Sequence, residues 1–173
     1  LVFDFGGGTF DAAVLSAEER VMKVVDTEGD NFLGGKNLDY AIVDHLLIPS
    51  LERQNSRKFY PIMSDEKRRE QLRTALKLQA EDAKIALSTG GSVKIYQEDL
   101  LGPDSDVELD IELSLAEMET VIKPIFQKAI DLTKKLLRRN RLDRGGLTQI
   151  VLVGGPTQMQ TLRQMLLDQL GVK

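Results

Sequence analysis

The chain of 173 residues contains no cysteine and a single histidine, His45. The absence of cysteine excludes a disulfide scaffold, thiol catalysis and any zinc site built on cysteine ligands. One histidine argues against a histidine-based metal site and against a Ser-His-Asp triad. We therefore expect His45 to be an ordinary packed or surface residue.

Long apolar runs and an excess of positive charge are also missing. No run approaches the roughly 20 apolar residues that a membrane helix needs, and Asp4 interrupts the first apolar stretch. We therefore expect neither contact with a membrane nor a signal peptide. The formal net charge of -4 gives no reason to expect nucleic acid as a partner. Because Leu1 already lies inside a strand-like run, we interpret the sequence as a piece of a longer polypeptide.

The first third of the sequence predicts a β-meander followed by a helix. Apolar runs at residues 1–5, 10–15 and 21–25 are separated by short polar or glycine-rich segments, as in strands joined by tight turns. A helix should begin with Asn37 as its N-cap, and Pro49 should bend or end it.

The middle of the sequence predicts a long helix and a small sheet. Ser64 can cap the helix, and Gly90-Gly91 ends it. Its buried side should consist of apolar residues at helical spacing, namely Leu72, Leu76, Ala83 and Leu87. Residues 93–96 and 107–113 alternate apolar with polar side chains, which predicts antiparallel strands, and residues 101–106 between them predict a turn.

The last third predicts two helices with a strand between them. Ser114 and Glu117 form a capping box that opens the first helix. The basic end of this helix, residues 134–141, indicates either a solvated end that complements the helix dipole or a ligand patch. Residues 150–153 are continuously apolar, as in a strand covered on both faces, and Thr157 or Gln158 should open the final helix.

These elements predict a mixed α/β fold in two layers. A sheet with packed helices should form the larger part. A smaller sheet-and-helix insertion should lie between about residues 53 and 113.

The strongest candidate site is a glycine-rich turn with a carboxylate on each side. It consists of Asp4, Gly6, Gly7, Gly8, Thr9 and Asp11. Consecutive amides in such a turn can form a nest that binds an anion, and glycine lets the backbone approach a ligand closely. Two carboxylates would repel a bare phosphate unless Mg²⁺ or a nucleophilic water lies between. The pattern favours a metal-bound polyphosphate, and the alternative is a glycine-rich hairpin with solvated aspartates.

Two further segments could bind a nucleotide. Residues 153–157 break a strand at two glycines before a helix, which places amides at the sheet edge. One stripe of the long helix consists of Glu81, Lys84, Ile85 and Ser88, which could bind a base and a ribose. The alternatives are a plain strand-to-helix turn and a solvated face with an i,i+3 ion pair.

Taken in this order, the motifs resemble those of the seventy-kilodalton heat-shock chaperones (DnaK-type). The matching segments are residues 1–11, 29–39, 80–88 and 152–159. The resemblance implies an actin-like ATPase fold, ribonuclease H-like in its subdomains, of which this chain is only the second lobe, in a divergent bacterial member. Residues 1–53 and 114–173 would form the inner subdomain with the phosphate and adenosine motifs, and residues 54–113 the outer subdomain that covers adenine.

The resemblance also implies roles for individual residues. Asp4 would hold Mg²⁺ through water, and Asp11 would position the attacking water. The residues that would contact ATP or ADP are Gly6, Gly7, Gly8, Thr9, Gly35, Glu81, Lys84, Ile85, Ser88, Gly154, Gly155, Pro156 and Gln158. Pro156 and Gln158 depart from the family pattern, and Gln158 removes a cation that is expected over the adenine.

For the intact protein, the resemblance implies a slow cytoplasmic ATPase that acts as a heat-shock chaperone in the stress response. ATP binding and hydrolysis would drive the clamping of unfolded peptide clients by a C-terminal domain outside this chain, aided by a J-domain co-chaperone and a nucleotide exchange factor. Without the first lobe, the chain alone should hydrolyse ATP negligibly. The competing functions are a non-hydrolysing actin-like scaffold and another actin-like ATPase, such as a filament-forming protein or a sugar kinase.

Overall fold

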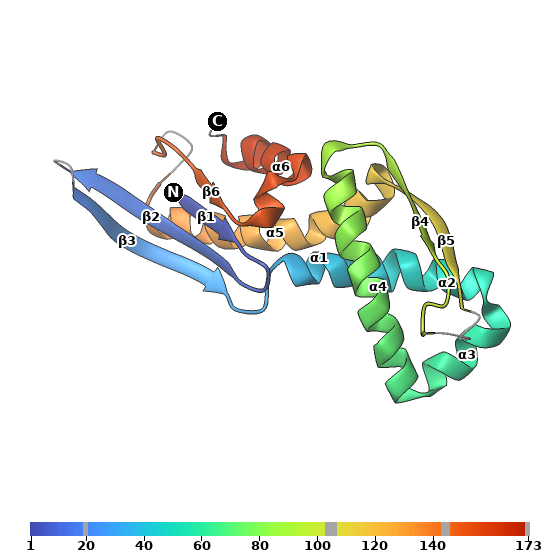
Figure 1. Ribbon diagram of the computed structural model, residues 1–173. Coiled ribbons are helices and arrows are strands. Elements are labelled where there is room, and N and C mark those ends of the chain that lie inside the picture. Colours follow the sequence, from blue (N-terminus) through green and yellow to red (C-terminus); the bar gives the residue numbers. More distant parts are fainter. Residues whose placement is uncertain (19–20, 103–106, 143–145, 172–173) are drawn as a thin grey trace. The chain divides into compact units, whose positions relative to one another are not determined.

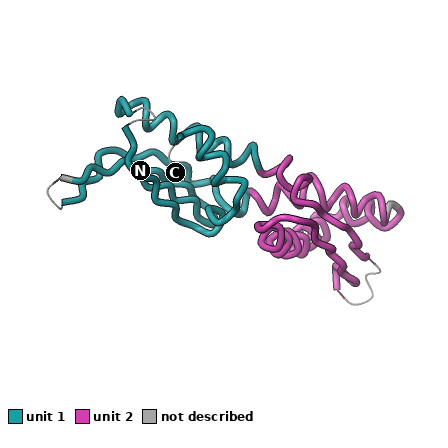
Figure 2. Tube along the Cα trace, turned by 90° about the horizontal axis from the view of Figure 1, so that it is seen from above, with its two compact units in different colours: residues 1–37, 123–173 teal, residues 38–122 magenta. Residues whose placement is uncertain are grey.

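The computed structural model describes residues 1–18, 21–102, 107–142 and 146–171 (Figure 1). Two compact units make up the chain: Leu1–Asn37 with Lys123–Lys173, and Leu38–Ile122 (Figure 2). Within the described ranges, no helix combines the length and the apolar character that crossing a membrane requires. The turn expected at residues 101–106 lies mostly outside the described residues.

The first unit is built on a four-stranded sheet in the order β3-β2-β1-β6. β1 (Val2–Phe5) pairs antiparallel with β2 (Phe10–Glu18), and β2 pairs antiparallel with β3 (Val21–Asp30). β6 (Val151–Val153) runs parallel to β1. The predicted meander is confirmed, and β2 and β3 extend beyond the predicted ends because their pairing continues along the whole hairpin.

Alternation along the first two strands separates a core face from a polar face. Phe3, Phe5 and Phe10 are fully buried. The ring of Phe5 meets Phe126 of α5 (Leu115–Arg139) edge-on, with the ring centroids 5.5 Å apart. Asp4 lies between the two buried phenylalanines of β1, so the period of two turns its carboxylate to the opposite face.

The two outer strands of this sheet are exposed. Val151 and Val153 of β6 are 45% and 41% exposed, so the prediction of a strand covered on both faces is wrong. These valines are exposed because β6 is the last strand in the sheet order of the described chain, with a neighbouring strand on one side only. On the other side, the first half of β3 exposes four apolar side chains, at Val21, Met22, Val24 and Val25.

The final helix, α6 (Gln160–Leu170), begins later than predicted. A 3₁₀ turn, η3 (Gly155–Gln158), precedes it and contains both residues expected to open the helix. The hydroxyl of Thr157 donates to the carbonyl of Gly154 (2.6 Å), and Met159 is extended, so Met159 becomes the N-cap. Leu162, Leu166 and Leu170 form a buried apolar face of α6.

After β3 come three helical segments that run directly into one another: α1 (Gly35–Ile42), the π-helical η1 (Val43–Leu47) and α2 (Ile48–Gln54). Asn37 lies inside α1 and is not its N-cap, because its Oδ1 reaches back to accept from the amide of Gly34 (2.7 Å). Pro49 does not end the helix. Its ring cannot fit the regular ladder, and the preceding segment widens so that the Ile48 amide donates to Val43, five residues back. His45, in η1, is exposed.

The second unit continues with α3 (Ser56–Ser64) and the long α4 (Glu66–Ala86). Asp65, not Ser64, caps α4, because the Asp65 carboxylate accepts from the amide of Arg68 (3.0 Å). Ser64 belongs to α3, where its hydroxyl donates to a carbonyl of the preceding turn. The predicted apolar face of α4 is buried, and the 3₁₀ turn η2 (Leu87–Thr89) leads to Gly90.

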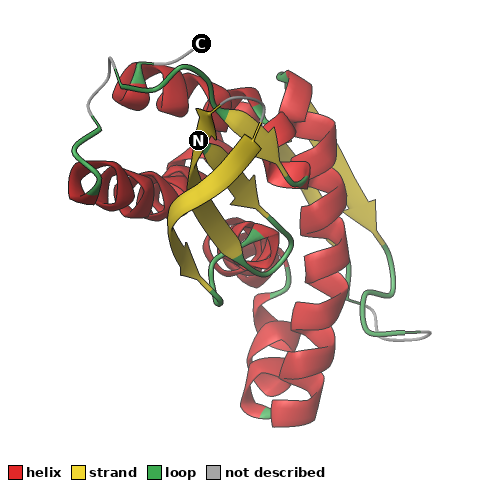
Figure 3. Cartoon of the chain, turned by 90° about the vertical axis from the view of Figure 1, so that its left-hand side faces the viewer, coloured by secondary structure: helices red, strands yellow, loops and turns green. Residues whose placement is uncertain are grey.

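A two-stranded sheet completes the second unit. β4 (Ser92–Gln97) pairs antiparallel with β5 (Leu109–Ser114), as the alternation predicts. The capping box is confirmed: the Ser114 amide donates to the Glu117 carboxylate (3.0 Å), and the Glu117 amide donates back to the Ser114 hydroxyl (3.3 Å). α5 then runs through Pro124 to Arg139. Figure 3 distinguishes the strands of both sheets from the helices by colour.

The basic end of α5 bonds to carboxylates of β3. Neither a solvated helix end nor a ligand patch, the two interpretations offered by the sequence, describes these bonds. Arg139 donates to both carboxylate oxygens of Asp26 (2.7 and 2.9 Å) and to Glu28 (2.9 Å). Asn140 also donates to Asp26 (2.7 Å), and Lys135 pairs with Glu28 at 3.2 Å. Hydrogen bonds from Arg139 and Asn140 lower the pKa of Asp26 to about 2. The hairpin and the helix are therefore joined by charge-assisted hydrogen bonds.

We expect Arg139→Ala to lower the midpoint of thermal unfolding at neutral pH, and this difference from the unaltered chain to shrink in acid. The pKa of Asp26 lies below its ordinary value of 3.8, so folding favours the ionised form. This stabilisation is fully present above about pH 4 and is lost as the pH falls through about 2. Thermal melts across that range measure it. The exposed neighbour Arg138→Ala is the control, and a pH-independent effect of Arg139→Ala would contradict the assignment.

Candidate functional site

The glycine turn between β1 and β2 is open to a ligand. The amide of Gly6 donates to the carbonyl of Thr9 (2.9 Å), which closes the turn. For the amides of Gly7, Gly8 and Thr9, the structure records no hydrogen-bond acceptor among the described residues. Three successive N–H groups are therefore available to an anion, which is the chemistry expected of a backbone nest.

A second glycine segment packs directly on this turn. The amide of Gly35 donates to the carbonyl of Gly6, and the amide of Lys36 donates to that of Gly7, both at 2.8 Å. A Cβ at Gly34 would lie 2.6 Å from the backbone of Gly8, so no other residue fits there without movement. The sequence assigned a binding role to Gly35 and missed the steric role of Gly34.

The third glycine segment reaches the same turn from the end of β6. Gly154 has φ +97°, and a Cβ there would lie 2.0 Å from the carbonyl oxygen of Phe5. A Cβ at Gly35 would lie 3.4 Å from the ring of Pro156. Gly155 is exposed, and Pro156 is buried. The structure thus brings together three segments that are far apart in the sequence, all within the first unit.

Asp4 and Asp11 lie opposite each other across β1 and β2. Directly paired residues of antiparallel strands project from the same face, so both carboxylates stand beside the glycine turn. Asp4 is half-buried and Asp11 is exposed. In the described part of the chain, no group of three or more His, Cys, Asp or Glu side chains could hold a metal ion. One or two carboxylates beside a phosphate site is the donor set that Mg²⁺ commonly uses, and the pair fits this ion.

Gln158 is accompanied by a cation that the sequence analysis missed. Arg163, one turn into α6, donates from Nη2 to the side-chain oxygen of Gln158 (3.2 Å) and from Nε to the carbonyl of Thr157 (2.8 Å). A guanidinium from the next helix thus lies beside Gln158. The contact was not predictable from the motif, because Arg163 lies beyond its end.

The predicted stripe on α4 belongs to the second unit and is held by a residue outside the motif. The Nζ of Lys84 lies 2.5 Å from Oδ1 of Asp39, which is 2% exposed. Glu81 pairs with Lys77 at 3.2 Å, so the i,i+3 ion pair between Glu81 and Lys84 does not form. Burial opposes the charge of Lys77, but Glu81 and Asp39 together raise its pKa.

The rest of the stripe is open. Ile85 is 62% exposed, and Ser88 donates its hydroxyl to the carbonyl of Ile85 (2.6 Å). An exposed apolar side chain flanked by a lysine and a carboxylate can contact a flat base and a sugar hydroxyl. The stripe therefore keeps the groups that the nucleoside interpretation requires.

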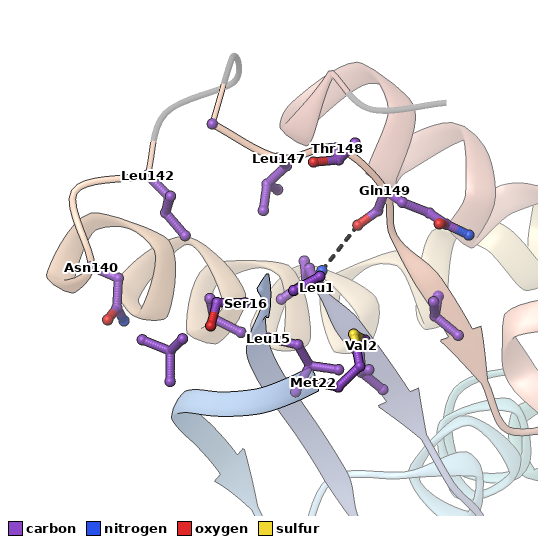
Figure 4. Close-up of a pocket in the computed structure, with 15 residues that line it drawn as sticks. Leu1, Val2, Leu15, Ser16, Met22, Asn140, Leu142, Leu147, Thr148 and Gln149 are labelled. Carbon is purple, nitrogen blue, oxygen red and sulfur yellow. Dashed lines mark hydrogen bonds between the residues drawn. The ribbon is translucent and has the colours of Figure 1, made fainter. Parts of the chain in front are cut away.

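A cavity of about 620 Å³ lies elsewhere in the first unit (Figure 4). Its walls are mostly apolar and contain none of the predicted site residues. The backbone nitrogen of Leu1 lies 3.0 Å from the carbonyl oxygen of Gln149 at its edge. A cavity of this character does not suit a polyphosphate, so the candidate site remains the glycine turn.

The mixed sheet, its flanking helices and the glycine turn define the chain as an actin-like ATPase fold of the nucleotide-binding class. Residues 1–173 match the family described as Hsp70 protein. The chain belongs to the Hsp70 family.

Three relatives illustrate the match. The chain is 35% identical, over its whole length, to "Heat shock 70 kDa protein BIP3" of Oryza sativa subsp. japonica, covering 24% of that protein. It is 31% identical over 96% of its length to "Heat shock cognate 70 kDa protein 3" of Dictyostelium discoideum, covering 25% of it. It is 32% identical over its whole length to "Chaperone protein DnaK" of Mycoplasma mobile, covering 28%. The chain thus spans about a quarter of the length of these relatives.

We expect Gly34→Ala to destabilise the first unit and Gly7→Ala to leave its stability nearly unchanged. A methyl group at Gly34 would strike the Gly8 backbone, whereas a Cβ at Gly7 would meet nothing within 4 Å. Overpacking of this kind costs about 1–3 kcal/mol, against less than about 0.5 kcal/mol for a substitution without contacts. Thermal unfolding of the two variants measures the difference. Equal stability of the two would show that the segments do not meet as described.

Proposed function

We propose that the chain is the second lobe of the nucleotide-binding domain of an Hsp70-type chaperone and that it holds the phosphates of Mg-ATP or Mg-ADP. The observation that carries the proposal is the position of three amides, which have no acceptor among the described residues, beside two carboxylates. Gly34 and Gly154 bring no side chain to this turn. Membership of the Hsp70 family supports it.

Each residue of the turn has a distinct task in this proposal. The amides of Gly7 and Gly8 and the hydroxyl of Thr9 donate to the β- and γ-phosphate oxygens. Asp4 would hold a hydrated Mg²⁺ through one of its water ligands, and such an ion would supply positive charge beside the phosphates. Asp11 accepts a hydrogen bond from the water that attacks the γ-phosphorus, so that the water's oxygen faces the bond to be broken.

The nucleoside side is assigned to two groups of residues, each within its own unit. In the first unit these are Gly35, Gly154, Gly155, Pro156 and Gln158, whereas Gly6 belongs to the phosphate turn. In the second unit they are Glu81, Lys84, Ile85 and Ser88. Charged and hydroxyl groups would bind the ribose hydroxyls, and exposed apolar atoms would contact the base.

For the intact protein we propose a slow ATPase in the cytoplasm that couples hydrolysis to the clamping of unfolded peptides. A J-domain co-chaperone and a nucleotide exchange factor would be its partners. The boundaries proposed for the subdomains are residues 1–53 with 114–173, and residues 54–113. The chain by itself is expected to hydrolyse ATP negligibly, because phosphoryl transfer depends on charges placed around the whole phosphate group.

We expect Asp11→Asn to lower ATP turnover of the intact protein by roughly 100-fold or more, because an amide does not accept the water's proton. Asp4→Asn should weaken Mg²⁺-dependent nucleotide binding by about 10–100-fold, as for other groups that hold a metal through an intermediate ligand. Calorimetric titration of Mg-ADP and single-turnover hydrolysis measure the two effects separately.

Asp82→Asn, an exposed substitution on α4, is the matched control and should change neither quantity. Nucleotide binding with turnover unaffected by Asp11→Asn would exclude the proposed role of Asp11. No binding of Mg-ATP to the intact protein would favour the alternative of a non-hydrolysing actin-like scaffold.

A further inference from the structure

A buried carboxylate outside the predicted motifs organises the nucleoside stripe of α4. Asp39, on α1, is 2% exposed. One of its oxygens lies 2.5 Å from Nζ of Lys84, and the other lies 3.7 Å from Nζ of Lys77. The side chain of Lys84 is itself only 12% exposed. An ammonium and a carboxylate buried to this degree hold each other in one geometry.

This contact restricts a side chain that is normally mobile. A lysine has four rotatable bonds and loses rotamer entropy when it is fixed. Asp39 fixes Lys84 before any ligand arrives, so that cost does not fall on binding. The ammonium has three N–H groups, and among the described residues its one recorded hydrogen bond goes to Asp39, which leaves N–H groups for a ligand.

Asp39 also influences the position of Glu81, the carboxylate of the stripe, through Lys77. Lys77 lies between Asp39 and Glu81, 3.7 Å from the first and 3.2 Å from the second. Glu81 is therefore held by a lysine that Asp39 attracts. Lys84 supplies donors and Glu81 supplies acceptors, and a vicinal diol contains both kinds of group.

We propose that Asp39 is the positioning residue of the nucleoside stripe: it fixes Lys84 directly and Glu81 through Lys77, so that the stripe selects a sugar with its hydroxyl groups over one without them. The inference rests on the proposed function. It assigns ribose selectivity to a buried residue of α1 that touches no nucleotide. The alternative is a purely structural role, in which Asp39 only neutralises the charge of Lys84 so that α4 can pack.

The test compares Mg-ADP, Mg-2′,3′-dideoxy-ADP and Mg-pyrophosphate as ligands of the intact protein. Asp39→Asn should weaken Mg-ADP binding about tenfold, because a charge-assisted hydrogen bond is lost, and should weaken dideoxy-ADP binding much less. Pyrophosphate binding, which uses only the glycine turn, should not change. In a Lys84→Met background, Asp39→Asn should weaken Mg-ADP binding much less, because only the indirect link to Glu81 through Lys77 is then lost. With Lys84 present, Asp39→Glu should keep part of the selectivity.

Asp44→Asn is the matched control. Asp44 is likewise an aspartate that pairs with a cation of α4, Arg73, at 3.0 Å, and within the described ranges it makes no recorded bond to the stripe. Equal weakening of all three ligands by Asp39→Asn, or unchanged ADP selectivity, overturns the inference while the proposed function stands. Failure of the unaltered protein to bind any of the three ligands overturns both.

Discussion

The candidate site depends on one steric constraint: three stretches of backbone meet at the turn between β1 and β2 with no space for side chains between them. Gly34 lies against Gly8, and Gly154 lies against the carbonyl of Phe5. Hydrogen bonds from Gly35 and Lys36 occupy the carbonyls of Gly6 and Gly7, whereas the amides of Gly7, Gly8 and Thr9 have no acceptor among the described residues. The turn can bind an anion for this reason: its carbonyl groups hold it against the neighbouring segment, and its N–H groups remain available to a ligand.

Features set by neighbouring residues could be predicted from the sequence. The alternation of Phe3, Asp4 and Phe5 determined both the core face and the polar face of β1. The capping box at Ser114 and the apolar face of α4 were equally local. The glycine turn was found for the same reason, since its residues are consecutive and its chemistry requires no distant partner.

Features that depend on distant residues could not be predicted. Arg139 and Asp26 are 113 positions apart, and Lys84 and Asp39 are 45 apart, so no local pattern indicates either contact. The sequence of α4 could not show whether Lys84 would turn to Glu81 or to another helix. The exposure of β6 likewise depends on which strands lie beside it, and the spacing of its valines is the same in either case.

The exposed first half of β3 has a consequence for the behaviour of the chain in solution. Val21, Met22, Val24 and Val25 are all more than half exposed and lie on an outer strand of the sheet. A strand with free backbone groups and apolar side chains is a template for pairing with another extended chain. A covering segment or a charged substitution on this short stretch would therefore disfavour pairing with another chain without touching the glycine turn.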